Sequence, residues 1–343
     1  MRRLLNTLYV TSQGAYLARE GDTVQVRVEH QTKLSVPIHT LGGIVCFGNV
    51  TTSPFLLGLC GERNVAVSYL SEHGRFLARV EGPVSGNVLL RREQYRRADD
   101  PVSCSAVASV IVGAKIANCR TVLLRAARER SEEATCEALR GAATHMARLL
   151  DQLDQTLEME TVRGREGDAA RAYFGVFDQL IAAQKDDFFF HERSRRPPLD
   201  NMNSLLSFLY TLVRHDVSAA LAGVGLDPAV GFLHTDRPGR PGLALDLMEE
   251  FRPYLADRLA LSLVNLQQVK GKGFRTSESG AVQMDDETRK TVLVAYQKRK
   301  QEEIQHPFLG EKVAVGLLPH VQAMLLARFL RGDLDGYPPF IWR

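Results

Sequence analysis

Hydrophobic and polar positions alternate along the first ninety residues, which predicts β-strands. In the segment VQVRV, residues 24–28, apolar side chains stand at every second position, the period with which a strand presents one face to a core. Further short runs, rich in β-branched and aromatic residues, occur at residues 8–10, 35–38, 44–47, 65–69 and 75–80. Glycine-containing turns separate these runs, and one short helix is expected between Pro54 and Asn64. This spacing fits a small β-sandwich or folded sheet.

After Pro101 the hydrophobic period changes to three and four residues, which predicts helices. The expected helices cover residues 102–128, 134–160, 168–183, 202–223, 243–264, 286–305 and 313–331. The charged segment RREQYRRADDP, residues 91–101, ends in proline and is typical of a linker. The Gly- and Ser-containing segment at residues 270–286 predicts a mobile loop or a small hairpin.

The predicted fold class is therefore a multi-domain α and β protein. A β-rich, sandwich-like N-terminal domain is expected at residues 1–92, a linker at residues 93–101, and a larger all-α domain at residues 102–343. A length of 343 residues agrees with two domains, because one hydrophobic core rarely organises so many.

Composition narrows the class of protein further. Hydrophobic residues make up 45% of the chain and charged residues 24%, which excludes extended disorder, collagen and a coiled-coil rod. The five cysteines are widely spaced without a CxxC pair, so reduced thiols and a cytoplasmic location are expected. No apolar window suggests a membrane span, and the first residues lack the pattern of a signal peptide. A net charge of +3 does not by itself indicate a nucleic-acid partner.

The segment GLDPAVGFLHTDRPGRPGLALDLMEEFRP, residues 225–253, holds the main chemical candidates. His234 lies in a loop, and Asp246 and Glu249 stand three apart on the helix that follows. That spacing places both carboxylates on one helical face. Two carboxylates with an imidazole suit Mg²⁺ or Mn²⁺. Alternatively, the two acidic residues form only a solvated helix face, with His234 an ordinary loop residue.

A second candidate is Glu166 in VRGREGDAARAYF, residues 162–174. It follows a glycine-containing turn and is expected at the entrance of a helix. Alternatively it only complements the helix dipole, a role that Asp168 would fill better.

The third segment is RSRRPPLDNMN, residues 193–203, in which Asp200 or Asn203 is expected to cap the helix. Its arginines could instead hold phosphates. Basic groups around a carboxylate–histidine cluster suit a site that handles phosphodiesters. The candidate DNA contacts are Arg193, Arg195, Arg196, Arg237, Arg240, Lys270 and Lys272. Neither a GxGxxG nor a GxxxxGK[ST] motif is present, so the usual nucleotide-binding folds have no support.

Together the blocks RGREGDAARAYF, RRPPLDNMNSLLSFLY, GLDPAVGFLHTDRPGRPGLALDLMEEFRP and YQKRKQEEIQHPF resemble the CRISPR-associated adaptation integrase family. The resemblance spans nearly the whole chain, and the closing GYPPFIWR looks most like the I-C subtype. It implies that Glu166, His234 and Glu249 hold Mg²⁺ or Mn²⁺ and that Asp246 completes the catalytic set. Which of Asp246 and Glu249 contacts the ion stays open, because the family often has Asp where Glu249 stands.

The resemblance also implies an activity and partners. The expected activity is that of a metal-dependent DNA endonuclease and integrase, which inserts short DNA fragments into the CRISPR array by transesterification and also cleaves branched DNA. The expected partners are DNA, a second copy of the chain paired through the β-rich domain, a small CRISPR adaptation protein, and a CRISPR-associated exonuclease of the same operon. The alternatives are a non-catalytic DNA-binding scaffold dimer and a phosphohydrolase of small nucleotides.

Overall fold

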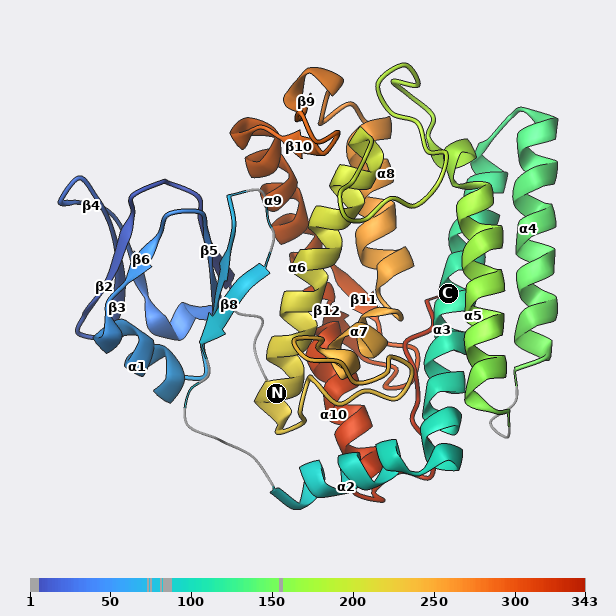
Figure 1. Ribbon diagram of the computed structural model, residues 1–343, viewed down its shortest axis with the longest axis horizontal. Coiled ribbons are helices and arrows are strands. Elements are labelled where there is room, and N and C mark those ends of the chain that lie inside the picture. The colour runs from blue at the N-terminus through green and yellow to red at the C-terminus, as the bar shows by residue number, and fades with distance from the viewer. Residues whose placement is uncertain are drawn as a thin grey trace. The chain divides into compact units, whose positions relative to one another are not determined.

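The structure is a computed structural model that describes residues 6–72, 74, 76–80, 82, 88–153 and 157–342 (Figure 1). The chain divides into two compact units, Met1–Gly86 and Asn87–Arg343. The first is β-rich and the second mainly helical, so the predicted fold class is confirmed.

Two four-stranded sheets form the first unit. One has the order β1-β5-β7-β8, and the other has the order β4-β3-β2-β6. The strands of the first sheet are Asn6–Val10 (β1), Leu41–Phe47 (β5), Ala66–Leu70 (β7) and Phe76–Val80 (β8). Those of the second are Tyr16–Glu20 (β2), Thr23–Val28 (β3), Gln31–Pro37 (β4) and Thr51–Thr52 (β6). The chain passes from β5 through β6 and the helix α1, Pro54–Glu62, to β7, which pairs in parallel with β5.

The core of this unit draws on both sheets and on α1. Leu17 and Val24 come from one sheet, Ile44 and Val67 from the other, and Leu56 from the helix. All five are nearly or fully buried. The alternation of apolar and polar positions thus produces the predicted sandwich-like packing.

Long helices form most of the second unit. They are α2 (Val88–Asp99), α3 (Pro101–Glu129), α4 (Glu133–Asp151), α5 (Met159–Gly175), α6 (Asn201–Val224), α7 (Gly242–Met248), α8 (Arg258–Asn265), α9 (Asp286–Gln301) and α10 (Leu318–Leu330). The helices α3, α4 and α5 lie side by side (Figure 1). Two short ribbons complete the unit: β9 (Phe274–Thr276) with β10 (Val282–Met284), and β11 (Glu303–Gln305) with β12 (Lys312–Ala314). The first ribbon is the small hairpin expected at residues 270–286.

The prediction of a linker at residues 93–101 is wrong, because α2 covers residues 88–99 and the units divide at Gly86 instead of residue 92. The side chain of Gln94 on α2 is fully buried. Its amide donates to the carbonyls of Asp227 and Val230, at 2.8 Å each, and accepts from the Asp227 N–H. The charges that suggested a linker lie on the exposed face of a helix that packs on its own unit.

The start of α5 also differs from the prediction. This helix begins at Met159, so Glu166 lies two turns inside it instead of at its entrance. A role of Glu166 toward the helix dipole is therefore excluded, because that effect is confined to the first turn. Asp168 is not at a helix start either; it bonds to His145 Nε2 of α4 at 3.2 Å.

The helix expected at residues 243–264 is interrupted. α7 ends at Met248, and a π-helical turn at Arg252–Asp257 (η3) precedes α8. Pro253 lies at the start of that turn and lacks the N–H that a continuous α-helix requires. Glu249 and Glu250 lie in the turn between α7 and η3.

The helix α3 is long and apolar enough to pass a membrane-span criterion. Of its most apolar window, 61% is buried inside the protein, and the helix packs against α2, α4, α5 and η3. α3 is therefore the central core helix of the second unit.

Candidate metal and phosphodiester site

Close backbone contact between two glycines shapes the loop that carries His234. Gly242, the first residue of α7, donates its N–H to the Ala229 carbonyl at 2.9 Å. A Cβ on Gly231 would lie 2.6 Å from the Gly242 carbonyl carbon and 2.7 Å from Asp246 Oδ2. No side chain fits there, so the loop can lie directly against the first turn of α7.

Replacing Gly231 by alanine is expected to displace the His234 loop from α7. The added methyl would meet backbone and a buried carboxylate, neither of which can move freely. We expect the unfolding free energy, measured by denaturant titration, to fall by about 1–3 kcal/mol. The rate of DNA cleavage should also fall, because His234 is displaced. Gly141→Ala, in open space on α4, is the control; equal effects in the two variants would contradict this account.

Asp246 fixes the loop through four hydrogen bonds. Its carboxylate is fully buried and accepts the backbone N–H groups of Phe232, Leu233 and His234 at 2.5, 3.0 and 3.0 Å. It also contacts Nδ1 of His234 at 2.6 Å. The carboxylate can only accept, so Nδ1 carries the proton. Asp246 thus positions the imidazole.

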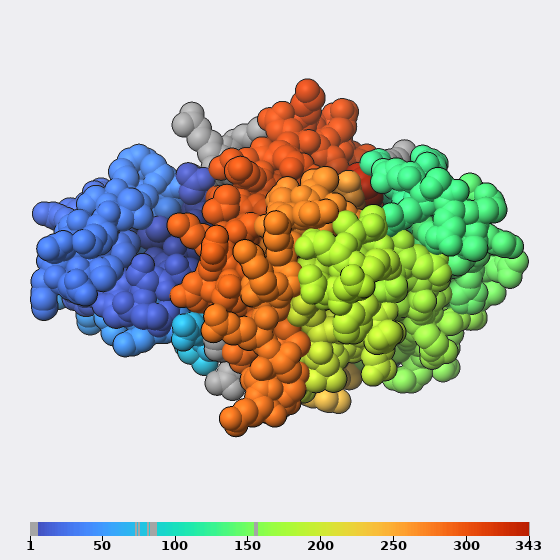
Figure 2. Space-filling model, turned by 90° about the horizontal axis from the view of Figure 1, so that it is seen from above, coloured from blue at the N-terminus to red at the C-terminus, as the bar shows by residue number. Residues whose placement is uncertain are grey.

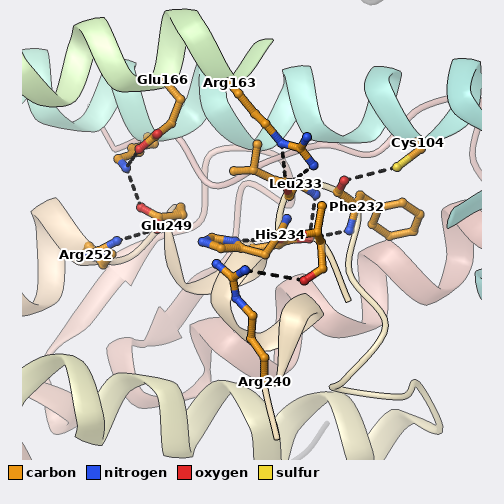
Figure 3. Close-up of polar contacts among 12 residues, drawn as sticks. Cys104, Arg163, Glu166, Phe232, Leu233, His234, Arg240, Glu249 and Arg252 are labelled. Atoms are coloured by element: carbon orange, nitrogen blue, oxygen red, sulfur yellow. Dashed lines mark hydrogen bonds and ion pairs between the residues drawn. The ribbon is translucent and has the colours of Figure 1, made fainter. Parts of the chain in front are cut away.

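The contact of Nδ1 with Asp246 leaves Nε2 as the ring nitrogen of His234 on the side away from that carboxylate. In Figure 3 the ring extends toward Glu249, and His234 contributes to the electrostatic environment of that carboxylate. The side chain is 21% exposed. A histidine whose Nδ1–H is bonded to a carboxylate is the usual arrangement of a metal-binding imidazole.

Two other helices attach to the same loop. Cys104 of α3 donates its thiol to the Phe232 carbonyl at 3.1 Å, and Arg163 of α5 donates to the Leu233 carbonyl at 3.1 and 3.3 Å (Figure 3). With Gln94 of α2 at the start of the loop, the loop is fixed from three sides.

Glu166 and Glu249 meet at one cation. The ammonium of Lys115, on α3, contacts Glu166 Oε1 and lies 2.8 Å from Glu249 Oε2. Glu249 Oε1 pairs with Arg252 (Figure 3). The side chain of Glu166 is 28% exposed, whereas that of Glu249 is 4% exposed. Glu166 and Glu249, which are far apart in the sequence, therefore both contact the ammonium group of Lys115.

Positive charge keeps Glu249 ionised. Burial disfavours the carboxylate, but Arg252 and Lys115 outweigh burial and lower its pKa from 4.5 to about 2. Arg252 also lies over the ring of Tyr210, 4.2 Å from the centroid. Tyr210 donates to Asp257 at 2.6 Å, and burial raises the pKa of Asp257 to about 6. Arg252 is thus held from two sides.

The described residues do not contain a ready-made group of three or more His, Cys, Asp or Glu side chains arranged around one point. The reason is visible in the contacts. Lys115 stands between Glu166 and Glu249, and Asp246 is saturated by donors from the His234 loop.

Arg193 does not have the exposed position expected of a DNA contact. It donates to Asn203 Oδ1 at 2.7 Å and Ser207 Oγ at 3.0 Å, and it lies over the Tyr210 ring. Burial lowers its pKa. Arg193 instead orders the start of α6, where Asp200 is the N-cap as predicted, accepting the Asn203 N–H at 2.7 Å.

The other basic candidates are more open. Arg195, Arg196, Arg237, Lys270 and Lys272 are exposed, and Arg240 is partly exposed beside the His234 loop (Figure 3). The segments at residues 187–200 and 270–284 lie side by side (Figure 2), with the Val282 N–H bonded to the Pro198 carbonyl. Four of these cations therefore come from neighbouring segments.

Sequence reasoning missed Lys115, Arg252 and Gln94. For Lys115 a signal exists: it is the single charge in the apolar run ASVIVGAKIAN, and Asn118 follows on the same face. A charge in a buried stripe requires a partner, but the partner's identity depends on how the helices pack. Gln94 could not be found, because its segment was interpreted as a linker.

Comparison with known proteins identifies the family. The family model described as "CRISPR associated protein Cas1" matches residues 8–298. A protein of Chlorobaculum tepidum named "CRISPR-associated endonuclease Cas1 1" is 56% identical over 343 residues, the full length of both chains. The chain belongs to the Cas1 family. A second Cas1 endonuclease, from Rhodospirillum rubrum, is 51% identical over the full length of both chains.

Solved structures agree on the fold. A Cas1 protein from Thermotoga maritima has a TM-score of 0.82 at 23% identity, covering 97% of this chain and 100% of its own. A casposase bound to an integration product gives 0.79 at 19% identity, with 97% and 92% covered. A Cas6-RT-Cas1–Cas2 complex gives 0.82 at 22% identity over 98% of this chain and 36% of that one. At these identities the likeness concerns the Cas1 fold alone.

Proposed function

We propose that this Cas1-family protein is a metal-dependent DNA endonuclease and integrase of CRISPR adaptation. It would insert short DNA fragments into the CRISPR array by transesterification and cleave DNA, including branched substrates. The observation that carries the proposal is the cation position shared by Glu166 and Glu249, close to an imidazole that Asp246 orients.

The side chains present fit a divalent ion. Glu166, His234 and Glu249 would hold Mg²⁺ or Mn²⁺, because hard carboxylate oxygens suit both ions and imidazole suits Mn²⁺ well. Asp246 would act through His234, since its oxygens already accept four hydrogen bonds. A bound divalent ion supplies polarisation of the phosphodiester and activation of the attacking hydroxyl.

The chain's own residues supply rigidity and charge. Arg252 fixes one oxygen of Glu249 and is itself held over Tyr210. Arg240, which contacts the Thr235 carbonyl beside His234, would neutralise a DNA phosphate. Further phosphates of the same strand would meet Arg195, Arg196, Arg237, Lys270 and Lys272, which are exposed.

Relatives and neighbours support the proposed partners. The names of two structural neighbours mention a Cas1–Cas2 complex and an integration product. A 35% identical protein of Geobacter sulfurreducens is an exonuclease Cas4/endonuclease Cas1 fusion. We therefore propose DNA, a small Cas2-type protein and a Cas4-type exonuclease as partners. We also propose a homodimer formed through the β-rich unit, a cytoplasmic location and, from the closing GYPPFIWR, the I-C subtype.

Removal of the metal is expected to abolish chemistry without abolishing DNA binding. The test incubates branched DNA with the purified protein in Mn²⁺ and in EDTA, and measures cleavage and strand transfer on denaturing gels and binding by fluorescence anisotropy. We expect cleavage and strand-transfer products in Mn²⁺ but not in EDTA, and DNA binding in both conditions. Binding without products in either condition would favour a non-catalytic scaffold, and preferential turnover of a mononucleotide would favour a phosphohydrolase.

A further inference from the structure

The site contains two cations of different character. Arg252 is anchored, because it pairs with Glu249 Oε1 and lies 4.2 Å from the Tyr210 ring centroid. Lys115 lies between the carboxylates of Glu166 and Glu249. It is an ammonium on a flexible four-carbon stem, a point charge that can be withdrawn without breaking a planar, bidentate contact.

The contacts of Lys115 coincide with those that a metal ion would make. Its Nζ contacts Glu166 and lies 2.8 Å from Glu249 Oε2, an oxygen that makes no well-aligned hydrogen bond. Such a contact is held by charge more than by direction. When it is lost, Glu249 keeps its other oxygen on Arg252, so the ligand set would stay in place.

Charge balance explains why a buried lysine stands here. Burial opposes the ammonium, but the carboxylates of Glu249 and Glu166 outweigh burial and raise the pKa of Lys115. Two carboxylates that approach the same point, one of them buried, repel strongly unless a cation lies between them. Lys115 can supply that charge, and so can a divalent ion.

We propose that Lys115 is an exchangeable internal cation, which holds Glu166 and Glu249 together in the metal-free protein and competes with the divalent ion for them. This inference rests on the proposed function, because it requires the metal site. It makes Lys115 a positioning residue that stabilises the metal-free site and weakens its affinity for metal.

Replacing Lys115 by methionine is expected to tighten Mn²⁺ binding. Methionine keeps much of the length and removes the charge, so the ion no longer has to displace a competitor. The measurement is isothermal titration of the full chain with MnCl₂ in the absence of DNA. We expect the dissociation constant to fall at least tenfold, about 1.4 kcal/mol. The melting temperature without metal should fall, and its rise on adding Mn²⁺ should exceed that of the wild type.

Three variants make the result specific. Lys300 is also a buried lysine, paired with Asp216 at 2.8 Å, and Lys300→Met should lower the melting temperature without changing Mn²⁺ affinity. Lys115→Arg keeps the charge and should not tighten binding. Lys115→Gln, neutral but able to donate hydrogen bonds, replaces the methionine variant if that protein fails to fold, and should also tighten binding.

The outcomes separate this inference from the proposed function. One outcome is that the wild type binds Mn²⁺, His234→Ala abolishes this binding, and Lys115→Met and Lys115→Gln bind Mn²⁺ no more tightly than the wild type. That outcome would contradict the proposed competition but support the metal site. Absence of Mn²⁺ binding in all variants overturns both. Tighter binding in the two neutral variants alone supports the exchange.

Discussion

Replacing His234 by alanine is expected to remove metal-dependent strand transfer while leaving the protein folded. The ring is partly exposed and its Nδ1 bonds to Asp246. Its removal therefore creates little cavity. The three backbone N–H bonds to Asp246 remain. We expect the rate with Mn²⁺ to fall by at least about a hundredfold, measured by strand transfer on branched DNA, with the melting temperature almost unchanged.

Asp246→Asn is the matched comparison for this variant. An amide cannot accept all four hydrogen bonds that Asp246 receives, so the His234 loop should loosen and stability should fall together with activity. Undiminished strand transfer by His234→Ala would remove the proposed ligand set. A His234→Ala protein that lost stability as severely as Asp246→Asn would instead show that the histidine is structural.

The fold was largely predictable because its helices and strands follow simple hydrophobic periods. The helix α6, Asn201–Val224, lies within one residue of its predicted bounds, since Asp200 caps one end and Gly225, in the left-handed conformation, closes the other. Prediction failed where local and tertiary effects compete. The segment at residues 88–99 is strongly charged but helical, because Gln94 and Leu90 are buried in the core of the second unit, to which α2 belongs.

The acidic residues and the histidine of the proposed site could be selected from the sequence, but the cations that balance their charge could not. Spacing placed Asp246 and Glu249 on one face of a helix, yet the structure gives them different partners. Asp246 faces the His234 loop, whereas Glu249 faces Arg252 and Lys115. No periodicity encodes that distinction, because it depends on the contact of α3, which carries Lys115, with the end of α7.

Glu250, next to Glu249 in the sequence, also has partners that the sequence pattern does not reveal. One position along a helix corresponds to a rotation of about 100°, so Glu250 points away from the direction of Glu249. It is fully buried and accepts hydrogen bonds from Tyr337 at 2.7 Å, the Phe340 N–H at 2.8 Å and Gln322 at 3.0 Å. Although these bonds favour the carboxylate, burial is stronger and raises its pKa to about 7.

The C-terminal segment packs against α3 and against the turn that carries Glu249 and Glu250. Asn118 of α3 donates to the carbonyls of Glu250 and Phe340 and accepts the Trp342 N–H at 2.7 Å. Arg125 and Arg258 lie over the Trp342 ring, at 4.0 and 4.3 Å from its centroid. Glu250 and Asn118 therefore join the chain end to the turn that carries Glu249.

Replacing Glu250 by alanine is expected to be the most destabilising of the substitutions considered. It leaves two donors, the Tyr337 hydroxyl and the Phe340 N–H, buried without their acceptor, whereas the Gln322 amide keeps Tyr337 Oη and the Pro338 carbonyl as acceptors. At about 1–3 kcal/mol for each of these two donors, the unfolding free energy should fall by about 2–6 kcal/mol, a large part of the total of about 5–15 kcal/mol. Denaturant titration measures this loss, and Glu303→Ala on the exposed strand β11 should change it by less than about 0.5 kcal/mol. Because Glu250 adjoins Glu249, the loosened turn should also weaken Mn²⁺ binding; a variant as stable as Glu303→Ala would show that the C-terminal segment does not support the site.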